Sequence, residues 1–581
     1  MTYLEPPRPD PKGNPMLEHV KDQYVTGKMD RRQFVRFASL LGMSATAAGT
    51  FLAACGGEDE APEGGGAKKT DTGKADLANA KRGGTYRIGS EIIEVDHPHR
   101  LSWVASSNVL RQANEYLTIT DAENVTHPYL LEKWEVNDTA NEWTLFLRQG
   151  IKWTDGKDLT IDDVMWNFQS WFDPKVGSST LGLLQPFFGK NDIEKVDEST
   201  LKLHLKKPTI QIPEFLYHYP AQILQQGYEP PDLKKGESLA AKTVGTGPFI
   251  IEEFKIGGGA RAVKNPDYWQ KGPDGKPLPF LDEIVWTDLG SERAPYVSAI
   301  QAGQIDSIYN LGPEQYATLK DDPNLEMKVA KSIETALFRM RVDMEPFTDK
   351  EVRNAFKLIQ PREEMANTAY FGLVDLGHDA HFGPADPDYV KKDIPQQDIE
   401  KAKEMLAGSA AWQKWGNKPI KITYKNDTRH EPVEAEVFQR AAKQAGINIE
   451  LDQRPATEYW PKWNHYHFGV TSWAHRPLNA MVQLLAYTKE ALPPDEKSGN
   501  WNETRWVNDE FLQLLSDVNA TPDLDERLKL ISQMEDIQAE DGGIGVPMFF
   551  ASLDLDTTRI KNRIAHPTDY QQLNETWIDE A

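Results

Sequence analysis

The stretch Tyr129–Pro174, YLLEKWEVNDTANEWTLFLRQGIKWTDGKDLTIDDVMWNFQSWFDP, contains strand, turn and helix signals in close succession. Apolar side chains occupy alternate positions across Trp143–Leu147, which is the period of a strand with one buried face. The dipeptide Asp155-Gly156 marks a turn after a second short strand. Thr160 and Asp163 have the spacing of a capping box at the start of a helix. The stretch therefore predicts two short strands and a helix, a combination typical of α/β proteins.

The chain is too long for one hydrophobic core. It has 581 residues, and roughly 500 of them follow Thr85. Single cores stop growing at about 250–300 residues, so we expect at least two lobes. Short β-branched and aromatic runs, such as Glu283–Thr287, alternate with helical patterns along this length. We therefore predict an α/β fold for the body of the protein.

The charge balance is strongly acidic. The chain carries 65 Lys and Arg residues against 89 Asp and Glu residues, which gives a formal net charge of -24. Binding to nucleic acid or to a membrane surface relies on clustered basic charge, so this balance argues against both partners. It fits an exported protein that is well hydrated.

The single cysteine, Cys55, follows a region with the parts of a secretory signal. Met29–Arg36 is basic, Phe37–Ala54 is uncharged, and small residues precede the cysteine, in the order that signal peptides use. The paired arginines resemble the twin-arginine export motif, although the Sec route stays open, and Leu-Ala-Ala-Cys resembles the lipobox of bacterial lipoproteins. The resemblance implies lipidation of Cys55. An uncleaved transmembrane anchor is the alternative.

The residues on either side of this signal are expected to be unstructured. Residues 1–28 precede it and are predicted either to be disordered or to lie before the true start, at Met16 or Met29; residues 1–54 would form an N-terminal extension and signal peptide. Residues 55–83 contain many glycines and charges but almost no large apolar side chain, which predicts a flexible tether. A lone cysteine also excludes an internal disulfide and Cys-x-x-Cys sites.

No familiar catalytic motif is found in the sequence. Phosphate-binding glycine loops, His-Glu-x-x-His and Gly-x-Ser-x-Gly are all absent. The pairs His97/His99 and His465/His467 share one face only in a strand, and they lack a recognisable third ligand. Ordinary pocket or surface histidines are therefore favoured over a metal site. We predict a protein that is not an enzyme and that has no catalytic residues, metal or cofactor.

Several separated segments resemble the peptide/nickel-type, family 5, extracytoplasmic solute-binding proteins of ABC importers. The strongest similarity lies in Tyr129–Pro174, and the matches run in order over roughly residues 83 to 560. Further matching segments are Gly83–Ile88, Asp96–His99, Val244–Phe249, Lys264–Trp269, Leu281–Ile284, Ala302–Asp306, Pro346–Ala355 and Arg527–Phe550. One departure is Gln360-Pro361-Arg362, where the family usually has Asp-Arg; proline suits a first helical turn, so the fold is not threatened.

The resemblance implies a two-lobed periplasmic-binding-protein-like fold of type II, in its large peptide-binding class. Crossover strands would join the lobes, and the ligand would lie in a cleft between them. Closure would be a population shift driven by contacts to both lobes. The expected divisions are residues 84–310 for lobe I, with an inserted subdomain at about 126–243, residues 311–545 for lobe II, and residues 546–581 returning to lobe I.

The resemblance also places two segments in the ligand cleft. Tyr309 and Asn310 are similar to a Tyr-Asn pair that contacts peptide backbones in oligopeptide-binding relatives, and internal packing at a hinge is the alternative. The second segment contains Trp473, His475 and Arg476. Peptide-binding relatives carry an Asp three residues after the Trp, where it pairs with the ligand's ammonium group. This chain carries Arg476 at that position.

Arg476 changes the ligand that we expect. A guanidinium group has only hydrogen-bond donors, so it repels a ligand ammonium and favours a carboxylate or a phosphate. We therefore expect ordinary peptides with a free N-terminus to bind poorly, and the ligand to carry an acidic or hydroxyl-rich group at this point. Pairing of Arg476 with a carboxylate of the protein is the alternative.

The leading hypothesis is a monomeric, lipid-anchored solute-binding protein at the periplasmic or extracytoplasmic face of the membrane. It would capture a small organic solute, such as a peptide, an opine or an oligosaccharide, and deliver it to the permease and ATPase subunits of an ABC importer. The alternatives are an exported carbohydrate-active hydrolase and a binding lipoprotein that presents its ligand for signalling or acts like a chaperone.

Overall fold

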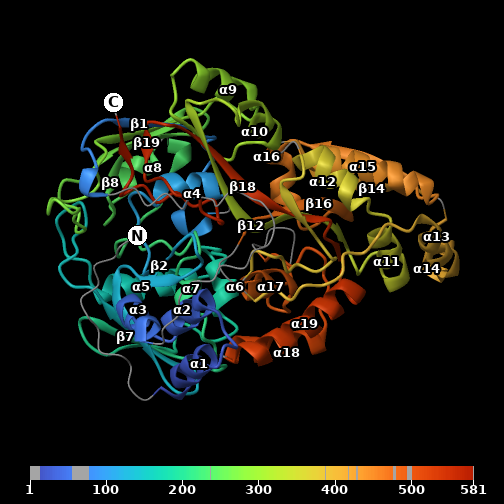
Figure 1. The fold of residues 1–581 in the computed structure, drawn as a ribbon, viewed down its shortest axis with the longest axis horizontal. Helices are drawn as coiled ribbons and strands as arrows, with labels where there is room; N and C mark the ends of the chain where they lie inside the picture. Colours follow the sequence, from blue (N-terminus) through green and yellow to red (C-terminus); the bar gives the residue numbers. More distant parts are fainter. Residues whose placement is uncertain are drawn as a thin grey trace.

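The computed structural model describes residues 14–54, 77–101, 103–235, 237–386, 388–416, 418–426, 430–475, 479–493, 500–521 and 523–579. Cys55, Arg476 and most of the expected tether lie outside these residues. Figure 1 shows two parts of unequal size, and the helices α11 (Lys350–Leu358) and α13 (Ile399–Gly408) to α15 (His430–Gln444) belong to the smaller one.

One large mixed sheet runs through both parts. Its strands are β1 (Thr85–Gly89), β8 (Phe249–Lys255), β9 (Gly259–Lys264), β10 (Glu283–Thr287), β11 (Ser307–Ile308), β12 (Leu325–Met340), β14 (Ile420–Lys425), β15 (Ile449–Arg454), β16 (Phe468–Trp473) and β18 (Met548–Thr557). They lie in the order β15-β14-β16-β12-β18-β11-β1-β10-β9-β8. We call the part around β1 and β8 to β11 the larger lobe, and the part around β14 to β16 the smaller lobe.

Strand β12 connects the two lobes. Its first half, Leu325–Lys331, pairs with β18, and its second half, Thr335–Met340, pairs with β16. The register shifts between Lys331 and Glu334. Figure 1 shows β12 and β18 crossing from one lobe to the other. The predicted α/β fold with two lobes and crossover strands is confirmed, whereas the residue boundaries expected for the lobes stay predictions.

The stretch Tyr129–Pro174 belongs to a separate antiparallel sheet of the larger lobe. This sheet has the order β4-β5-β7-β6, with β4 at Leu131–Val136, β5 at Glu142–Leu147, β6 at Ile193–Lys195 and β7 at Thr200–His204. The alternation across Trp143–Leu147 thus forms a strand, as predicted. The second short strand is reduced to an isolated bridge between Lys152 and Asp158, because the chain turns at Asp155-Gly156 between them.

Helix α5 (Ile161–Trp171) begins where the sequence predicts. The Thr160 hydroxyl accepts from the backbone N–H of Asp163 at 3.3 Å, and the Asp163 carboxylate accepts from the backbone N–H of Thr160 at 2.8 Å. This reciprocal capping box satisfies N–H groups that have no partner inside the helix, and it fixes the residue at which the helix starts.

The remaining elements complete the two lobes. The short strands are β2 (Thr118–Thr120), β3 (Thr126–Pro128), β13 (Val374–Leu376), β17 (Ile544–Gly545), β19 (Ile560–Lys561) and β20 (Trp577–Ile578). The helices are α4 (Val104–Leu110), α6 (Thr180–Leu184), α7 (Ile212–Phe215), α8 (Leu239–Lys242), α9 (Ala294–Gln301), α10 (Pro313–Leu319), α12 (Arg362–Tyr370), α14 (Ala410–Trp415), α16 (Ala456–Tyr459), α17 (Asn479–Tyr487), α18 (Asp509–Ala520) and α19 (Leu524–Asp541).

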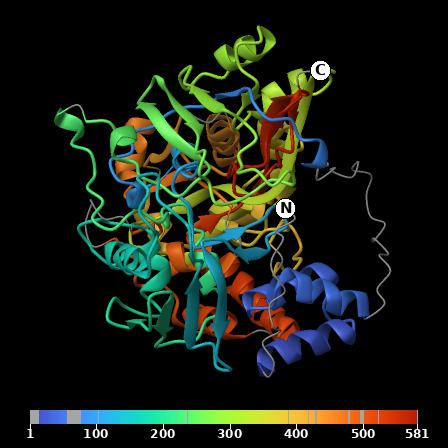
Figure 2. The ribbon, with the colours of Figure 1, turned by 90° about the vertical axis from the view of Figure 1, so that its left-hand side faces the viewer.

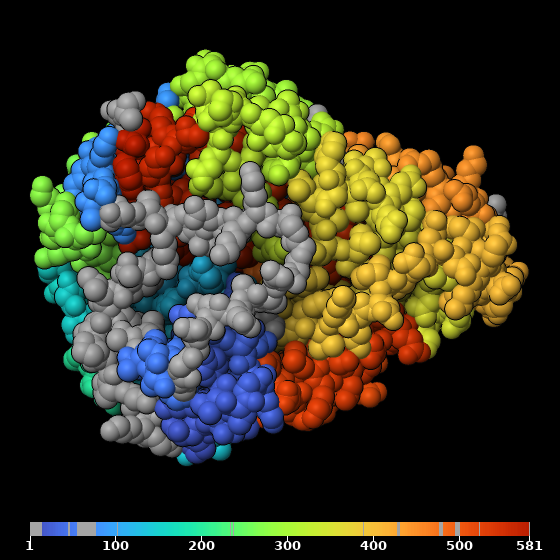
Figure 3. Space-filling view, in the orientation of Figure 1, coloured from blue at the N-terminus to red at the C-terminus, as the bar shows by residue number. Residues whose placement is uncertain are grey.

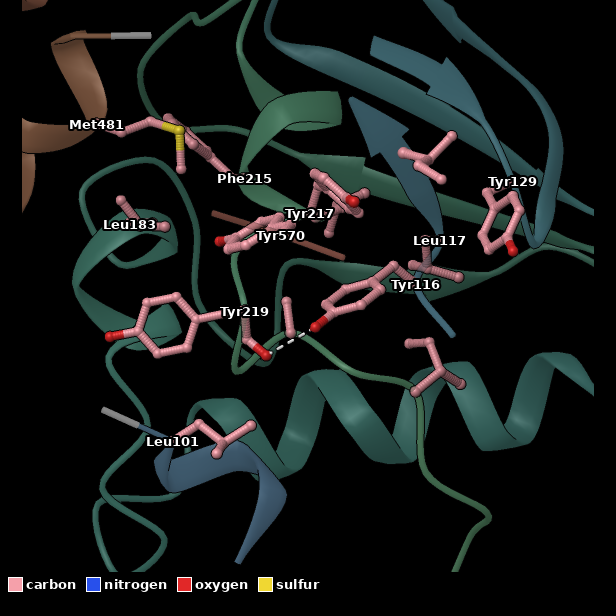
Figure 4. Packing of buried hydrophobic residues seen from close by; sticks show 14 of the residues in the cluster. Leu101, Tyr116, Leu117, Tyr129, Leu183, Phe215, Tyr217, Tyr219, Met481 and Tyr570 are labelled. Carbon is pink, nitrogen blue, oxygen red and sulfur yellow. Dashed lines mark hydrogen bonds between the residues drawn. The ribbon is translucent and has the colours of Figure 1, made fainter. Parts of the chain in front are cut away.

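Each lobe has its own apolar core. The core of the larger lobe also receives residues from late in the chain: in Figure 4, Met481 of α17 approaches Phe215 of α7 and Leu183 of α6. Nearby, the Tyr116 hydroxyl donates to the backbone oxygen of Tyr219 at 3.0 Å, so a buried polar group is satisfied within the core. Helix α17 therefore anchors the later part of the chain on the larger lobe.

The residues before Cys55 form the helices α1 (Pro15–Val25), α2 (Arg31–Leu40) and α3 (Ala45–Ala54). They share an apolar cluster in which the rings of Phe34 and Phe51 stack at 5.1 Å. Figure 2 shows the three helices together at one corner of the molecule. The expectation that residues 1–28 are disordered is therefore wrong over α1, because its apolar face is buried in this cluster.

Helices α1 to α3 also contact the body of the protein. Arg36 Nη2 lies 3.4 Å from Glu214 Oε1, and both side chains are buried. Burial raises the pKa of Glu214 to about 8, although Arg36 lowers it. Trp134 Nε1 donates to the backbone oxygen of Leu40 at 3.0 Å, and in Figure 3 the N-terminal helices border α18 and α19. In the described part of the chain, helices long and apolar enough to cross a membrane are absent.

We predict that Phe338→Ala destabilises the smaller lobe. Phe338 of β12 is 1% exposed, and its ring stacks on Phe438 of α15 at 4.7 Å. Loss of a buried Phe side chain leaves a cavity and costs about 3–5 kcal/mol of unfolding free energy. Urea unfolding followed by near-UV circular dichroism measures the change. Ile256→Ala is the control, since Ile256 is 54% exposed, and equal destabilisation by both variants would contradict the prediction.

Candidate functional site

A cavity of about 260 Å³ lies beside the point where β12 crosses between the lobes. The larger lobe supplies Trp103, Tyr309, Asn310 and Asp569 to its wall, and the smaller lobe supplies Tyr370, Lys425, His430, Trp460 and Trp473. Because both lobes contribute side chains, a molecule held in this cavity contacts both of them.

Indole rings make up much of the wall. The lining tryptophans are Trp103, Trp460, Trp463, Trp473 and Trp501. Their rings meet edge to face along one chain of contacts, at 5.2 Å between Trp103 and Trp460, 6.0 Å between Trp460 and Trp463, 6.0 Å between Trp463 and Trp473, and 5.7 Å between Trp473 and Trp501. Such a wall presents large apolar faces to the apolar part of a ligand or to a cation.

Two carboxyl groups occupy the wall near the crossing strands. Glu334 follows the register shift in β12, and Asp569 has a left-handed backbone with φ 57°. The Ser552 hydroxyl donates to the Asp569 carboxyl group. Burial, and then the nearby carboxyl groups of Glu334 and Asp554, raise the pKa of Asp569 well above its ordinary value.

The two basic residues of the wall lie next to acidic side chains. Lys425 Nζ donates to Glu431 in a buried pair and lies 3.3 Å from the Ser472 hydroxyl. Arg293 Nη1 lies 4.0 Å from Glu91 Oε1. Each positive charge on the described wall is therefore close to a negative charge of the protein itself.

Three of the residues predicted for the cleft line the cavity: Tyr309, Asn310 and Trp473. Asn310 has a left-handed backbone with φ 51°, and its N–H donates to Asp554 Oδ1 at 2.6 Å. This contact fixes the segment after β11 at the cavity wall. Trp473 is the last residue of β16, and its indole N–H donates to Glu503 Oε1 at 2.8 Å.

His475, another of the predicted contacts, is not among the described residues that line the cavity. His475 is buried, and its Nδ1 accepts from the backbone N–H of Ile333 at 3.0 Å. Its Nε2 lies 3.3 Å from Asn124 Oδ1, on the larger lobe. His475 therefore bridges the lobes next to the cavity. Arg476 lies outside the described residues.

A buried ion pair supports the tryptophan wall from behind. Arg339 Nε lies 2.6 Å from Glu503 Oε2, and the side chains are 0% and 3% exposed. Arg339 also donates to the backbone oxygen of Trp463 at 2.6 Å, while Glu503 holds the Trp473 indole. Burial raises the pKa of Glu503, although Arg339 and the hydrogen bond from Trp473 lower it. The pair thus connects β12 to two of the indole rings.

Sequence reasoning missed Glu334, Asp569 and most of the tryptophan wall. Only the segment Tyr459–Trp463, YWPKW, carried a signal, because three aromatic residues in five are unusual. Glu334 and Asp569 carried no such signal, because they are two of the 89 Asp and Glu residues in the sequence. Groups of three or more His, Cys, Asp or Glu side chains that could hold a metal ion are absent from the described residues.

The comparisons with known proteins agree with this architecture. Residues 125–491 match the family model "Bacterial extracellular solute-binding proteins, family 5 Middle". The dipeptide-binding protein DppE of Bacillus subtilis (strain 168) is 23% identical over 512 residues, which cover 83% of this chain and 88% of that protein.

Solved structures of similar fold include DppA of Helicobacter pylori in complex with the peptide STSA and AgaA of A. tumefaciens R10 in complex with agropinic acid. The first has a TM-score of 0.75 at 18% identity and the second a TM-score of 0.74 at 22% identity; each match covers 86% of this chain and 99% of the other. The two-lobed fold of this class, predicted from the resemblance, is confirmed. Since the family model matches more than half of the chain, the protein belongs to the family 5 bacterial extracellular solute-binding proteins.

Proposed function

We propose that this protein captures a small organic solute outside the cytoplasmic membrane and delivers it to the permease and ATPase subunits of an ABC importer. The cavity beside β12 carries the proposal, because side chains of both lobes line it. A solute bound there stabilises the closed arrangement through contacts to both lobes. The comparisons give no support to the alternative of an exported hydrolase.

Contacts across the cavity support a closing motion. The rings of Trp103 and Trp460 meet at 5.2 Å across the lobes, and His475 lies 3.3 Å from Asn124. Entry or release of a solute requires these contacts to separate. The crossing strands β12 and β18 provide the connection about which the lobes can move.

Tyr309, Asn310 and Trp473 are our proposed ligand contacts, because all three line the cavity. We do not propose that His475 contacts the ligand, since both of its ring nitrogens face protein atoms. Arg476 remains a proposed contact on the basis of the sequence. Relatives named for dipeptides and for agropinic acid make peptides and opines the solute classes to test first.

Cys55 is our proposed site of lipid attachment, after export through a twin-arginine signal. A fatty-acylated cysteine followed by a polar tether would hold a monomeric body near the membrane without embedding it. Removal of residues 1–54 would also remove helices α1 to α3 and the Arg36–Glu214 contact.

We predict that the protein purified without dialysis carries a solute that mass spectrometry identifies after denaturation. The solute should bind again to stripped protein in calorimetry, and Arg476→Ala should weaken it by roughly tenfold, which corresponds to about 1.4 kcal/mol. Several unmodified dipeptides serve as comparison ligands. Tight binding of these dipeptides, or an unchanged affinity in Arg476→Ala, would contradict the role of Arg476.

We predict that Cys55→Ser releases the protein from the membrane fraction without changing its affinity for the solute. The hydroxyl of serine cannot replace the thiol in lipid attachment, whereas the cavity is built from Glu91 and residues that follow it. Cell fractionation and the intact mass of the wild-type protein measure the effect. A wild-type mass that includes residues 1–54 and lacks acyl chains would rule out the anchor.

We predict that Glu503→Gln lowers both stability and solute affinity. It breaks a buried ion pair, which costs about 3–5 kcal/mol, and it loosens Trp463 and Trp473. Thermal unfolding and calorimetry measure the two effects. Asp388→Asn is the matched control, because it breaks the buried Arg527–Asp388 pair, whose residues do not line the cavity. If both variants change affinity equally, Glu503 has no special role at the site.

A further inference from the structure

Two tyrosine hydroxyls at the cavity wall make no hydrogen bond within the part of the chain that the structure describes. They belong to Tyr309 and Tyr370, which are 6% and 7% exposed and lie on opposite lobes. Burial raises the pKa of both well above the ordinary value, and Glu334 and Asp569 contribute to both shifts. Two neutral hydroxyl groups therefore lie near the same two carboxyl groups, where a ligand can reach them.

Asp569 differs from the acidic residues beside it. Asp554 and Asp556 pair with the buried guanidinium of Arg563, at 3.3 Å in the case of Asp556. The Asp569 side chain instead contacts Ser552 and Glu334, and the carboxyl groups of Glu334 and Asp554 act on it as like charges. A buried carboxyl group in this setting gains more from an added cation than one that already pairs with arginine.

The charged side chains of the whole wall also favour a cation. Among the described residues that line the cavity, four are acidic and two are basic: Glu91, Glu292, Glu334 and Asp569 against Arg293 and Lys425. Both basic residues lie beside a carboxylate, Arg293 beside Glu91 and Lys425 beside Glu431. The wall thus offers negative potential next to the faces of indole rings, which are the two features that attract a positively charged organic group.

We propose that the cavity selects a small organic cation whose ammonium or guanidinium group lies against Glu334 and Asp569. The carboxyl oxygens and the hydroxyls of Tyr309 and Tyr370 accept its N–H donors, and charge-assisted bonds of this kind are the strong ones. The apolar part of the cation packs on the indole rings. This inference rests on the proposed function, since it names the class of solute that the same cavity holds.

The test compares two probes that differ in one group. Tyramine carries an ammonium group where tyrosol carries a hydroxyl group, and the rest of the two molecules is the same. Calorimetry with the stripped full-length protein should give at least about tenfold tighter binding of tyramine, as expected for hydrogen bonds to charged groups. The double variant Glu334→Gln/Asp569→Asn should reduce this preference to within about twofold, which is under about 0.5 kcal/mol.

The double variant Glu94→Gln/Glu132→Gln is the matched control. Glu94 and Glu132 are exposed and do not line the cavity, so their removal changes net charge equally but should leave the preference for tyramine intact. An unchanged affinity for tyrosol in the Glu334→Gln/Asp569→Asn variant shows that the cavity is still folded. Equal binding of the two probes to the wild type, or a preference that survives in the Glu334→Gln/Asp569→Asn variant, would overturn the inference.

Failure of cation selection can be distinguished from failure of the proposed function. A neutral or anionic solute released from the purified protein would refute cation selection and leave solute binding in place. Absence of any released solute, together with the absence of binding by either probe, would count against both.

Discussion

The continuous strand β12 is the constraint on which the rest of the structure depends. It is hydrogen-bonded to β18 in one half and to β16 in the other, so both lobes share one backbone segment. Its register shift lies between Lys331 and Glu334, next to the cavity. The interruption of the ladder re-aims the side chain of Glu334, which lines the cavity, as irregularities in strands commonly do near binding sites.

Around this strand, buried polar contacts set the positions of the wall. Arg339 lies on the second half of β12 and reaches the backbone oxygen of Trp463, and its partner Glu503 holds the indole of Trp473. On the other side, Asp554 of β18 accepts from the backbone of Asn310. Because these donors and acceptors are buried and paired, the indole rings are held in a defined arrangement before a solute arrives, which reduces the entropy lost on binding.

The sequence predicted what is local and missed what depends on tertiary contacts. The capping box at Thr160 and the alternation across Trp143–Leu147 act over a few residues, and both predictions are confirmed. The two-lobed fold was predicted from the family resemblance of segments that are spread along the chain. By contrast, Glu334 and Asp569 are 235 positions apart and lie in segments without a motif. Their proximity depends on where β12 crosses and on the left-handed turn at Asp569, which no short pattern encodes.

The two charge arguments for the solute are compatible. The sequence argues for an acidic or hydroxyl-rich group near Arg476, and the described wall argues for a cationic group near Glu334 and Asp569. Trp473 is in register with Thr335, the residue after Glu334, so the segment that leads to Arg476 leaves β16 close to these carboxyl groups. A solute that carries both charges would satisfy both arguments. A solute whose charges all have one sign satisfies only one of these two arguments. Selection would therefore depend on the spacing between the charges of the solute as well as on their sign.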